Sequence, residues 1–422
     1  MKRRILLVLL ALLAVAATAI GLAWPREDFV AARSPADHAP TEANIARGAY
    51  LARAGDCMAC HTARGGVPYA GGRALDTPFG RLVAPNITPE AATGIGSWTP
   101  DDFWRALHDG KSRDGRLLYP AFPYTHYTRV TRPDVDALFA YFRSLPPVRQ
   151  HNAPHALRFP YNQQLTLAGW RLLYFKSGVQ VADKAKDARW NRGAYLVEGL
   201  GHCAACHSAR NRLGATDGTL GGGLIPTIGW YAPSLTADAE AGLGKWSEAD
   251  IVRLLGTGVA PGASVTGPMA EVVMQSLQYL SRDDLGAMAV YLKSLPAPAA
   301  PDRAPAPQPP RQAMQAGGKL YGQHCAACHG ERGQGKGPYP ALAGNRALAL
   351  AEPVNAIRAV LHGGFAPGTQ GNPRPYGMPP FGHVLGDTEV ATLVSYLRAS
   401  WGNAAAPVSS AEVNRYRSVP LD

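Results

Sequence analysis

The pattern Cys-x-x-Cys-His occurs three times in this 422-residue chain, and its three copies use all six cysteines. It is the attachment pattern of c-type haem, in which both thiols bond to the porphyrin and the histidine ligates the iron. The sequence therefore predicts three covalently bound haem c groups. The predicted attachment residues and proximal iron ligands are Cys57, Cys60 and His61, then Cys203, Cys206 and His207, and finally Cys325, Cys328 and His329.

Other uses of paired cysteines fit the spacing less well. A structural zinc site usually closes one tetrahedron from two cysteine pairs, whereas here neighbouring pairs lie more than 100 residues apart. A thioredoxin-like dithiol needs a βαβ context, which the sequence does not show. Disulfide frameworks belong to short chains that are dense in cysteine. Covalent haem attachment accounts for all six residues.

Residues 1–24 are typical of an export segment. Lys2, Arg3 and Arg4 precede residues 5–24, which carry no charge. A small-residue cleavage site is present at residues 17–19, but the apolar run continues to Trp24 and is long enough to span a bilayer. Residues 1–24 are therefore compatible with a cleaved signal peptide and with a membrane anchor. Either one places the rest of the chain on the periplasmic side of the bacterial inner membrane, anchored or peripheral.

The charge distribution argues against nucleic acid as a partner. The formal net charge is +11, but four of the basic residues flank the export segment. The rest of the chain has no Lys/Arg run of the kind that follows a phosphate backbone. No nucleotide-binding loop is predicted either, because the glycine-rich residues 330–337 follow a haem motif and not a strand.

An internal repeat accompanies the haem motifs and predicts three tandem haem domains. Arg-Gly-Ala-Tyr-Leu at residues 47–51 and 192–196, and a related segment at residues 317–321, precede the cysteines. Thr99 and Ser247 are predicted N-caps of later helices. Each domain closes on a segment with apolar residues at i, i+3, i+4 and i+7. Because no stretch alternates like a strand for long, the predicted fold class is all-α.

The repeat and the composition also set the expected boundaries. Gly and Pro are abundant, and residues 297–311 form a Pro/Ala-rich connector. The tail beyond Trp401 is polar and is expected to be poorly ordered. The predicted segments are residues 1–24 (signal peptide or anchor), 41–150 (domain 1), 151–187 (linker), 188–296 (domain 2), 297–311 (linker), 312–402 (domain 3) and 403–422 (tail).

Methionines in Pro/Gly loops are the predicted distal ligands of the second and third irons. Methionine sulfur raises the potential of an electron-transfer haem. Met378 lies in such a loop between the third motif and the last helix, and Met269 follows Gly-Pro in the second domain. Met274 is a weaker rival of Met269. Met288 lies on an apolar helix face, and Met314 precedes its motif.

The first domain departs from this pattern, because no methionine lies between His61 and the second domain. Cys203 and Met269 are 66 residues apart, and the matching position, 65 residues after Cys57, is Phe122. A phenylalanine cannot ligate iron. His126, in the same loop, is the predicted sixth ligand. A five-coordinate or water-ligated iron and His108 stay open as alternatives.

The three motifs, the Arg-Gly-Ala-Tyr-Leu repeats and the loop at residues 118–124 resemble the tri-haem cytochrome c subunits of bacterial membrane-associated dehydrogenases. The resemblance covers about residues 40–402 and implies three cytochrome c-like domains with His61, His207, His329, Met269 and Met378 as iron ligands. Phe122 stands where the alcohol dehydrogenase type usually has methionine, which leaves the first ligand set open.

The resemblance implies an electron-transfer subunit, not an enzyme by itself. Electrons would pass from a molybdenum, flavin or quinoprotein catalytic subunit to ubiquinone, or to a downstream cytochrome or oxidase. Two other functions remain: a haem enzyme with an open first haem, peroxidase-like, and a free periplasmic electron shuttle. Peroxide turnover by the isolated protein would distinguish the enzyme from the relay.

Overall fold

The computed structural model describes residues 3–4, 40–238, 242–297 and 306–419. The chain divides into two compact units, Met1–Ala52 with Cys60–Val181, and Arg53–Ala59 with Ala182–Asp422. Apart from Arg3 and Arg4, the predicted export segment lies outside the described residues. No helix within the described ranges is long and apolar enough to cross a membrane.

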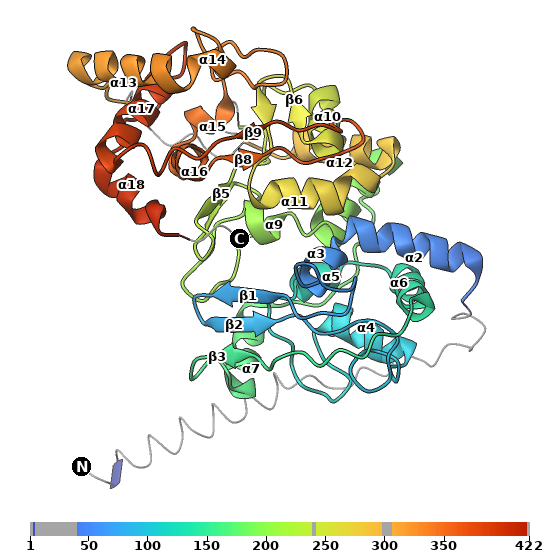
Figure 1. Ribbon diagram of the computed structural model, residues 1–422. Helices are drawn as coiled ribbons and strands as arrows, with labels where there is room; N and C mark the ends of the chain where they lie inside the picture. The colour runs from blue at the N-terminus through green and yellow to red at the C-terminus, as the bar shows by residue number, and fades with distance from the viewer. Residues whose placement is uncertain (1–2, 5–39, 239–241, 298–305, 420–422) are drawn as a thin grey trace. The chain divides into compact units, whose positions relative to one another are not determined.

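Short helices separated by long loops make up most of the first part of the chain (Figure 1). The elements up to Val181 are α2 (Glu42–Ala54), α3 (Cys57–His61), β1 (Ala74–Thr77), β2 (Gly80–Val83), α4 (Pro100–Asp109), α5 (Tyr124–Tyr127), α6 (Arg132–Ser144), β3 (Ala156–Leu157) and α7 (Gln164–Tyr174). The segment predicted as the first linker therefore contains β3 and α7.

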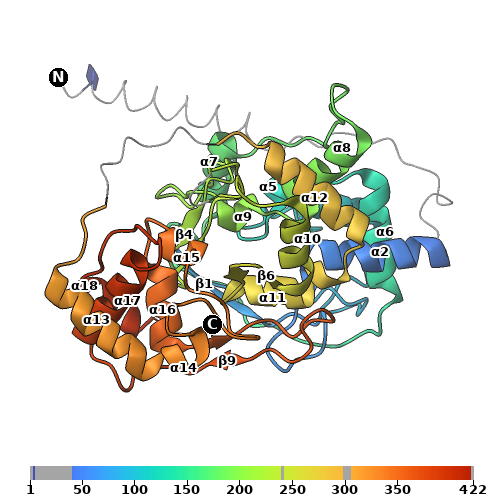
Figure 2. The ribbon, with the colours of Figure 1, turned by 90° about the horizontal axis from the view of Figure 1, so that it is seen from above.

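The remainder of the chain repeats this organisation twice (Figures 1 and 2). Its elements are α8 (Ala188–Tyr195), the π-helix η2 (Leu196–Leu200), α9 (Ala204–His207), β4 (Gly223–Ile225), β5 (Trp230–Ala232), α10 (Glu248–Thr257), β6 (Val259–Ala260), β7 (Ala263–Ser264), α11 (Pro268–Gln275), the 3₁₀-helix η3 (Leu277–Tyr279), α12 (Arg282–Ser294), α13 (Arg311–His324), α14 (Ala326–His329), α15 (Arg346–Ala349), α16 (Val354–His362), β8 (Gly364–Phe365), β9 (Gly377–Met378), α17 (Asp387–Ala399) and α18 (Ser410–Arg417).

The prediction of an all-α fold is wrong. The described residues include a three-stranded antiparallel sheet, β1-β2-β3, and the antiparallel pairs β4–β5, β6–β7 and β8–β9. The pair β8–β9 aligns Gly364 with Met378 and Phe365 with Gly377. These strands are two to four residues long, so none is long enough to show the alternation that marks a strand in a sequence.

The helix before each haem motif packs against the last helix of the same domain through a glycine of the repeat. A Cβ on Gly48 would overlap the carbonyl oxygen of Ala137, and one on Gly193 would overlap that of Ala287. At the third site, the Cβ of Tyr396 occupies the space beside Gly317. Figures 1 and 2 show the third pair, α13 and α17, side by side. Glycine is needed at these positions because any side chain would push the two helices apart.

The arginine of the repeat also links these two helices through an ion pair in the first and second domains. Nε of Arg47 donates to Oδ1 of Asp134 at 2.6 Å. Arg192 makes a bidentate pair with Asp284, with both N–O distances at 2.8 Å. Each aspartate lies in the first turn of its helix, where a negative charge also interacts favourably with the helix dipole.

The second domain has one more residue between its repeat and its motif than the first. Arg47 precedes Cys57 by ten residues, whereas Arg192 precedes Cys203 by eleven. The extra residue is accommodated by the π-helix η2, a common result of a one-residue insertion into a helix. Within η2, Glu198 accepts a hydrogen bond from the hydroxyl of Tyr291 at 2.8 Å, which ties the widened turn to α12.

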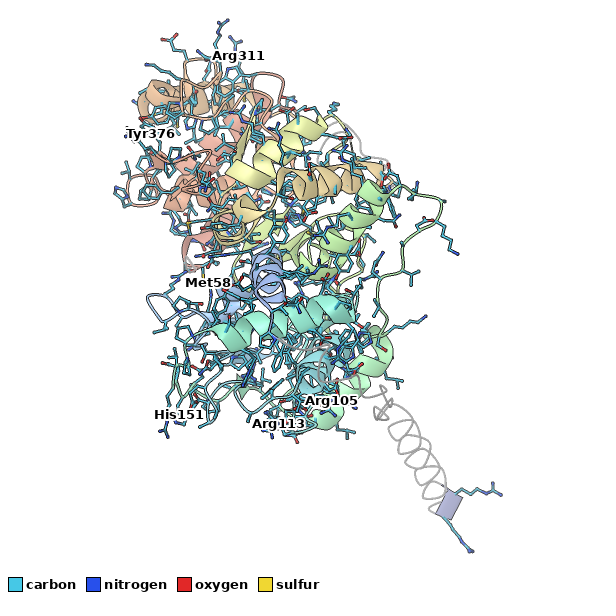
Figure 3. All side chains as sticks on the ribbon, turned by 90° about the vertical axis from the view of Figure 1, so that its right-hand side faces the viewer. Met58, Arg105, Arg113, His151, Arg311 and Tyr376 are labelled. Atoms are coloured by element: carbon cyan, nitrogen blue, oxygen red, sulfur yellow. The ribbon has the colours of Figure 1, made fainter. Side chains whose placement is uncertain are left out.

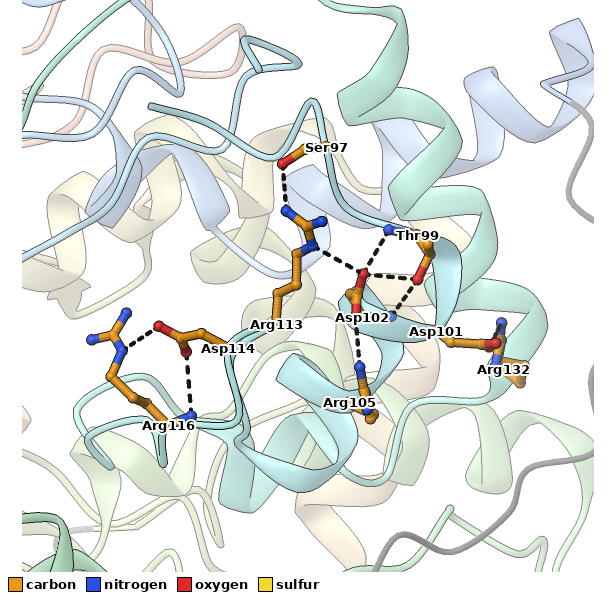
Figure 4. A network of polar contacts seen from close by, with 9 residues as sticks. All are labelled: Ser97, Thr99, Asp101, Asp102, Arg105, Arg113, Asp114, Arg116 and Arg132. Atoms are coloured by element: carbon orange, nitrogen blue, oxygen red, sulfur yellow. Dashed lines mark hydrogen bonds and ion pairs between the residues drawn. The ribbon is translucent and has the colours of Figure 1, made fainter. Parts of the chain in front are cut away.

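Helix α4 begins with a capping box, as predicted for Thr99 (Figure 4). The hydroxyl of Thr99 accepts from the backbone N–H of Asp102 at 3.1 Å, and Asp102 accepts from the backbone N–H of Thr99 at 2.9 Å. Arg105 pairs with the same carboxylate. Burial raises the pKa of Asp102, but the bonds from Thr99 and Arg105 outweigh it and hold this pKa below its ordinary value. Ser247 also caps its helix, since its hydroxyl accepts from the backbone N–H of Asp250 at 3.1 Å at the start of α10.

Replacing Asp102 by alanine is expected to lower the free energy of unfolding at neutral pH by about 2 kcal/mol, since the cap and a partly buried ion pair are both lost. The deficit should shrink as the pH falls through the depressed pKa of Asp102, because the wild-type carboxylate then protonates. Urea unfolding at several pH values measures this. Asp114→Ala, which breaks an exposed pair with Arg116, is the control and should cost less than about 0.5 kcal/mol. Equal losses for the two variants would contradict the role of the cap.

The tail after Trp401 does not match the expectation of poor order. Helix α18 packs on α16 and α17, and Val413 is fully buried in the core of the third domain. A capping box between Ser409 and Glu412 starts the helix. At its end, Arg417 pairs with Asp387 of α17. Residues 403–419 are therefore part of the folded third domain.

Candidate haem sites

The three Cys-x-x-Cys-His motifs form single helical turns. The first is α3, while Cys203 and Cys325 directly precede α9 and α14. Met58 lies inside the first turn, between its two cysteines (Figure 3). A single turn places the two thiols and the following histidine close together at one surface. This arrangement suits the attachment of one planar group.

Three of the motif thiols, Cys203, Cys206 and Cys325, lack the environment of a catalytic cysteine. Burial raises the pKa of Cys203 to about 12 and that of Cys325 to about 11, and it also raises the pKa of Cys206. A nucleophilic or redox-active cysteine requires a lowered pKa, so that the thiolate forms near neutral pH. The environment of these three thiols therefore does not favour a thiolate near neutral pH.

All three motif histidines are oriented by the same backbone contact. Nδ1 of His61 lies 2.8 Å from the carbonyl oxygen of Pro85. The matching distances are 2.6 Å for His207 to Pro233 and 2.8 Å for His329 to Pro340. A carbonyl only accepts, so Nδ1 is the donor, which leaves Nε2 as the nitrogen available to a metal when the imidazole is neutral. This second contact is how proteins fix the tautomer of a metal-binding histidine.

The electrostatic surroundings act in the same direction. Burial lowers the pKa of His61 and of His207, partly offset by the contacts with the proline carbonyls. A lowered pKa keeps the imidazole neutral, which is the form that binds metal. The thiol pairs, with a histidine oriented by a backbone carbonyl, thus suit haem at all three sites. In the described part of the chain, no group of three or more His, Cys, Asp or Glu residues could hold another metal ion.

The proline carbonyls were not predicted as functional, although a signal was present. Pro85 and Pro233 begin matching segments of the internal repeat, Pro-Asn-Ile-Thr and Pro-Ser-Leu-Thr. Backbone groups have no residue signature of their own, so a repeated proline was the only available sign. Asn86 also fixes this segment, since its side chain donates to the carbonyl of Val148 at 2.7 Å.

The two predicted methionine ligands lie in short, well-anchored segments. Met378 is in β9 and is half-buried against the core of the third domain. Met269 is the second residue of α11, after Pro268. The helix follows Gly267, which has a positive φ and lies against the ring of Trp230. By contrast, Met274 is exposed and Met288 is buried in the core of α12. Met314 lies in α13, before its motif.

In the first domain, Phe122 stands at the position that matches Met269, and His126 follows it in the same loop. Phe122 packs against Tyr127, with ring centroids 5.4 Å apart. His126 lies in α5 and is buried, with 8% of its surface exposed. His108 lies flat on Trp104, and its Nδ1 is 2.9 Å from the carbonyl oxygen of Thr128. Both candidate histidines are therefore held inside the first unit.

The short helices, the repeated motif turns and the histidines oriented by proline carbonyls together define a chain of c-type haem domains. The cytochrome c family model matches residues 45–146, 191–296 and 314–401, and the chain belongs to the cytochrome c family. Haem c is the covalently bound cofactor of this family. The three matched segments each contain one Cys-x-x-Cys-His motif.

Comparison with characterised proteins confirms the resemblance to dehydrogenase cytochrome c subunits. The chain is 40% identical to the gluconate 2-dehydrogenase cytochrome c subunit of Pantoea cypripedii, over 90% of this chain and 91% of that protein. It is 38% identical to the cytochrome c subunit of the quinone alcohol dehydrogenase of Gluconobacter oxydans, over 89% and 83%. It is also 42% identical to one of the nicotinate dehydrogenase subunits of Pseudomonas putida over 90% of this chain, but spans only 32% of that protein.

Proposed function

We propose that the protein is a tri-haem cytochrome c that relays electrons from a dehydrogenase catalytic subunit and is not itself an enzyme. The observation that carries the proposal is the threefold occurrence of one site, in which a histidine directly follows a pair of thiols and is oriented by a proline carbonyl. Haem supplies one-electron redox chemistry, and the protein holds the groups in place and tunes their potentials.

The partner is a catalytic subunit of the molybdenum, flavin or quinoprotein type, and the acceptor is ubiquinone or a downstream cytochrome or oxidase. The names of the relatives support this, since they are subunits of gluconate, alcohol and nicotinate dehydrogenases. The relay works on the periplasmic side of the inner membrane. The basic export segment of the sequence supports this location.

Rapid mixing of the purified complex with the substrate of its catalytic subunit tests the relay. The expected result is that the haem irons are reduced, as followed by absorbance, at a rate set by the catalytic subunit. They should be reoxidised on addition of a ubiquinone analogue. Haems that stay oxidised while substrate is consumed would contradict the proposal. Peroxide turnover by the isolated protein would instead favour the peroxidase-like alternative.

The axial ligands that we propose are His61 with His126, His207 with Met269, and His329 with Met378. Two observations on this chain support the first set: His126 is buried, and it follows Phe122 in the loop equivalent to that of Met269. A bis-histidine haem has a lower potential than a histidine–methionine haem, because methionine sulfur favours the ferrous state. The first haem should therefore have the lowest potential of the three.

Replacing His126 by leucine is expected to convert one of the three haems to a high-spin form that binds CO, because the first iron loses its sixth ligand. Visible and EPR spectra of the oxidised protein, and CO difference spectra of the reduced protein, measure this. His108→Leu is the matched control and should leave all haems low-spin. A high-spin haem in the control alone would identify His108 as the ligand. A CO-binding haem already present in the wild-type protein would indicate an open first site.

A further inference from the structure

Helix α7 is apolar on both of its faces, although only one face packs against the protein. On the inner face, Leu167 and Ala168 are buried in a small cluster with Leu117. On the outer face, Leu165, Leu172 and Leu173 recur at i, i+7 and i+8 and are 55%, 58% and 67% exposed. A surface helix normally has a polar outer face, so this outer face is unusual.

The inner face holds α7 firmly, so the exposed leucines are not the result of a loosely attached helix. Oε1 of Gln164 accepts from the backbone N–H of Leu117 at 2.8 Å. The guanidinium of Arg171 is buried and lies over the rings of Phe175 and Tyr124, at 4.5 Å and 5.2 Å from their centroids. The outer leucines are therefore presented on a fixed helix.

Two further exposed apolar residues lie on either side of the helix in the chain. Phe159 precedes α7 and Val181 follows it, and each is about four-fifths exposed. Trp170 and Tyr174 form an aromatic pair on the helix, with ring centroids 5.4 Å apart. In Figure 1, α7 lies beside β3, which belongs to the same unit. We call Phe159, Leu165, Leu172, Leu173 and Val181 the α7 surface. Exposed apolar residues that gather in this way mark an interaction site.

The charge of this part of the chain indicates which partner fits. Residues 137–182 contain five Lys or Arg residues and no Asp or Glu. Of the basic residues, Arg158 and Lys176 flank α7 and are exposed. Asp183, exposed two residues after Val181, is the first acidic residue beyond this stretch. An apolar helix face with basic residues at both ends, and with Trp and Tyr beside it, is the pattern of a helix that lies in the interface of an anionic bilayer. Protein interfaces usually carry a rim with charges of both signs.

We propose that the α7 surface docks the first unit onto the anionic lipid surface of the membrane, with the outer leucines inserted among the acyl chains. The proposal rests on the proposed periplasmic function. It assigns a membrane contact to α7 itself, whether or not the export segment is cleaved. Docking of α7 would place the first haem domain at the bilayer where ubiquinone resides.

A fluorescent probe on α7 tests the proposal in the full-length holoprotein. Because all six natural cysteines are bonded to haem, Leu173→Cys introduces the only thiol that can be labelled. The matched control is Val384→Cys, at an exposed apolar position of the other unit. An environment-sensitive label at each position is then read in vesicles of phosphatidylglycerol and of phosphatidylcholine. Iodide serves as the aqueous quencher, and nitroxide on the acyl chains serves as the membrane quencher.

The expected result is a blue-shifted Leu173→Cys probe in phosphatidylglycerol vesicles that is protected from iodide and quenched from the acyl chains. The Val384→Cys probe should remain open to iodide. Equal iodide access at the two positions would overturn the proposal. Protection of the Leu173→Cys probe only after addition of the catalytic subunit would also overturn it and would assign the α7 surface to that protein.

A second variant separates this proposal from the proposed function. Leu172→Glu with Leu173→Glu should weaken docking to phosphatidylglycerol vesicles by about 100-fold, because two inserted side chains are lost. Haem content, visible spectra and haem reduction by the catalytic subunit in solution should stay unchanged. Normal docking of this variant to the vesicles would contradict the membrane proposal and leave the electron relay unaffected. Absence of haem reduction in the wild-type complex would instead count against the electron relay.

Discussion

Replacing Gly48 by alanine lowers the free energy of unfolding of the first unit by about 3 kcal/mol, because the new methyl group overlaps the carbonyl oxygen of Ala137. The obstacle is backbone and not a flexible side chain, so the two helices must separate to relieve it. The Cβ of Tyr141, which lies on α6 like Ala137, would also be too close to the new methyl group. Urea unfolding, followed by far-UV circular dichroism and haem absorbance, measures the loss.

Gly169→Ala is the matched control for Gly48→Ala. Gly169 lies in the middle of α7 in the same unit, and a Cβ there meets nothing within 4 Å. Alanine in a helix is favoured over glycine by about 0.5–1 kcal/mol, so this variant should be as stable as the wild-type protein or slightly more stable. A Gly48→Ala protein as stable as the control would contradict the close packing of α2 on α6. Gly193→Ala should repeat the loss in the second domain.

Replacing His207 by leucine is expected to leave the haem groups attached but to interrupt the proposed relay. Cys203 and Cys206 remain in place, so the attachment should survive, while the second iron loses its proximal ligand. Changes to groups that only orient a metal ligand already cost about 10–100-fold in activity. Loss of the ligand itself should therefore lower quinone reduction by the complex by about 100-fold or more.

The control for this variant is His383→Leu, at an exposed position of the same unit. It should retain quinone reduction and the wild-type spectrum. Intact mass and circular dichroism show whether the His207→Leu protein still carries its haems and its fold. A folded His207→Leu protein with normal quinone reduction would mean that electrons do not pass through the second haem.

The helical framework was largely predictable from the sequence, because it follows from local signals that act over one or two turns. Thr99 and Ser247 cap their helices as expected, and the final helix of each domain has the expected apolar face. The capping box of Ser409 and Glu412 was an equally good signal for α18. It was overlooked because the polar composition of the tail was given more weight.

The small sheets and the outer face of α7 could not be predicted in the same way. A two-residue strand such as β9 exists because backbone groups around Met378 pair with β8, and no side-chain pattern reports such a pairing. In the sequence of α7, leucines occur on more than one face of the helix, and this pattern is compatible with a buried helix and with an interfacial helix. Only the structure distinguishes the buried Leu167 from the exposed Leu173.

The candidate sites follow the same division. The attachment cysteines and the proximal histidines are predictions made from their own side chains, whereas the proline carbonyls that orient the imidazoles required the fold. The sixth ligand of the first haem remains a prediction, because both His126 and His108 lie inside the first unit.

The number of haems on the mature holoprotein tests the central claim most directly. Intact mass spectrometry under denaturing conditions, with peptide mapping to define the N-terminus, measures it without dependence on any partner. The account predicts a polypeptide carrying three covalently bound haem groups, one on each Cys-x-x-Cys-His peptide. A mature protein with fewer than three, or with a motif peptide that bears unmodified thiols, would contradict it.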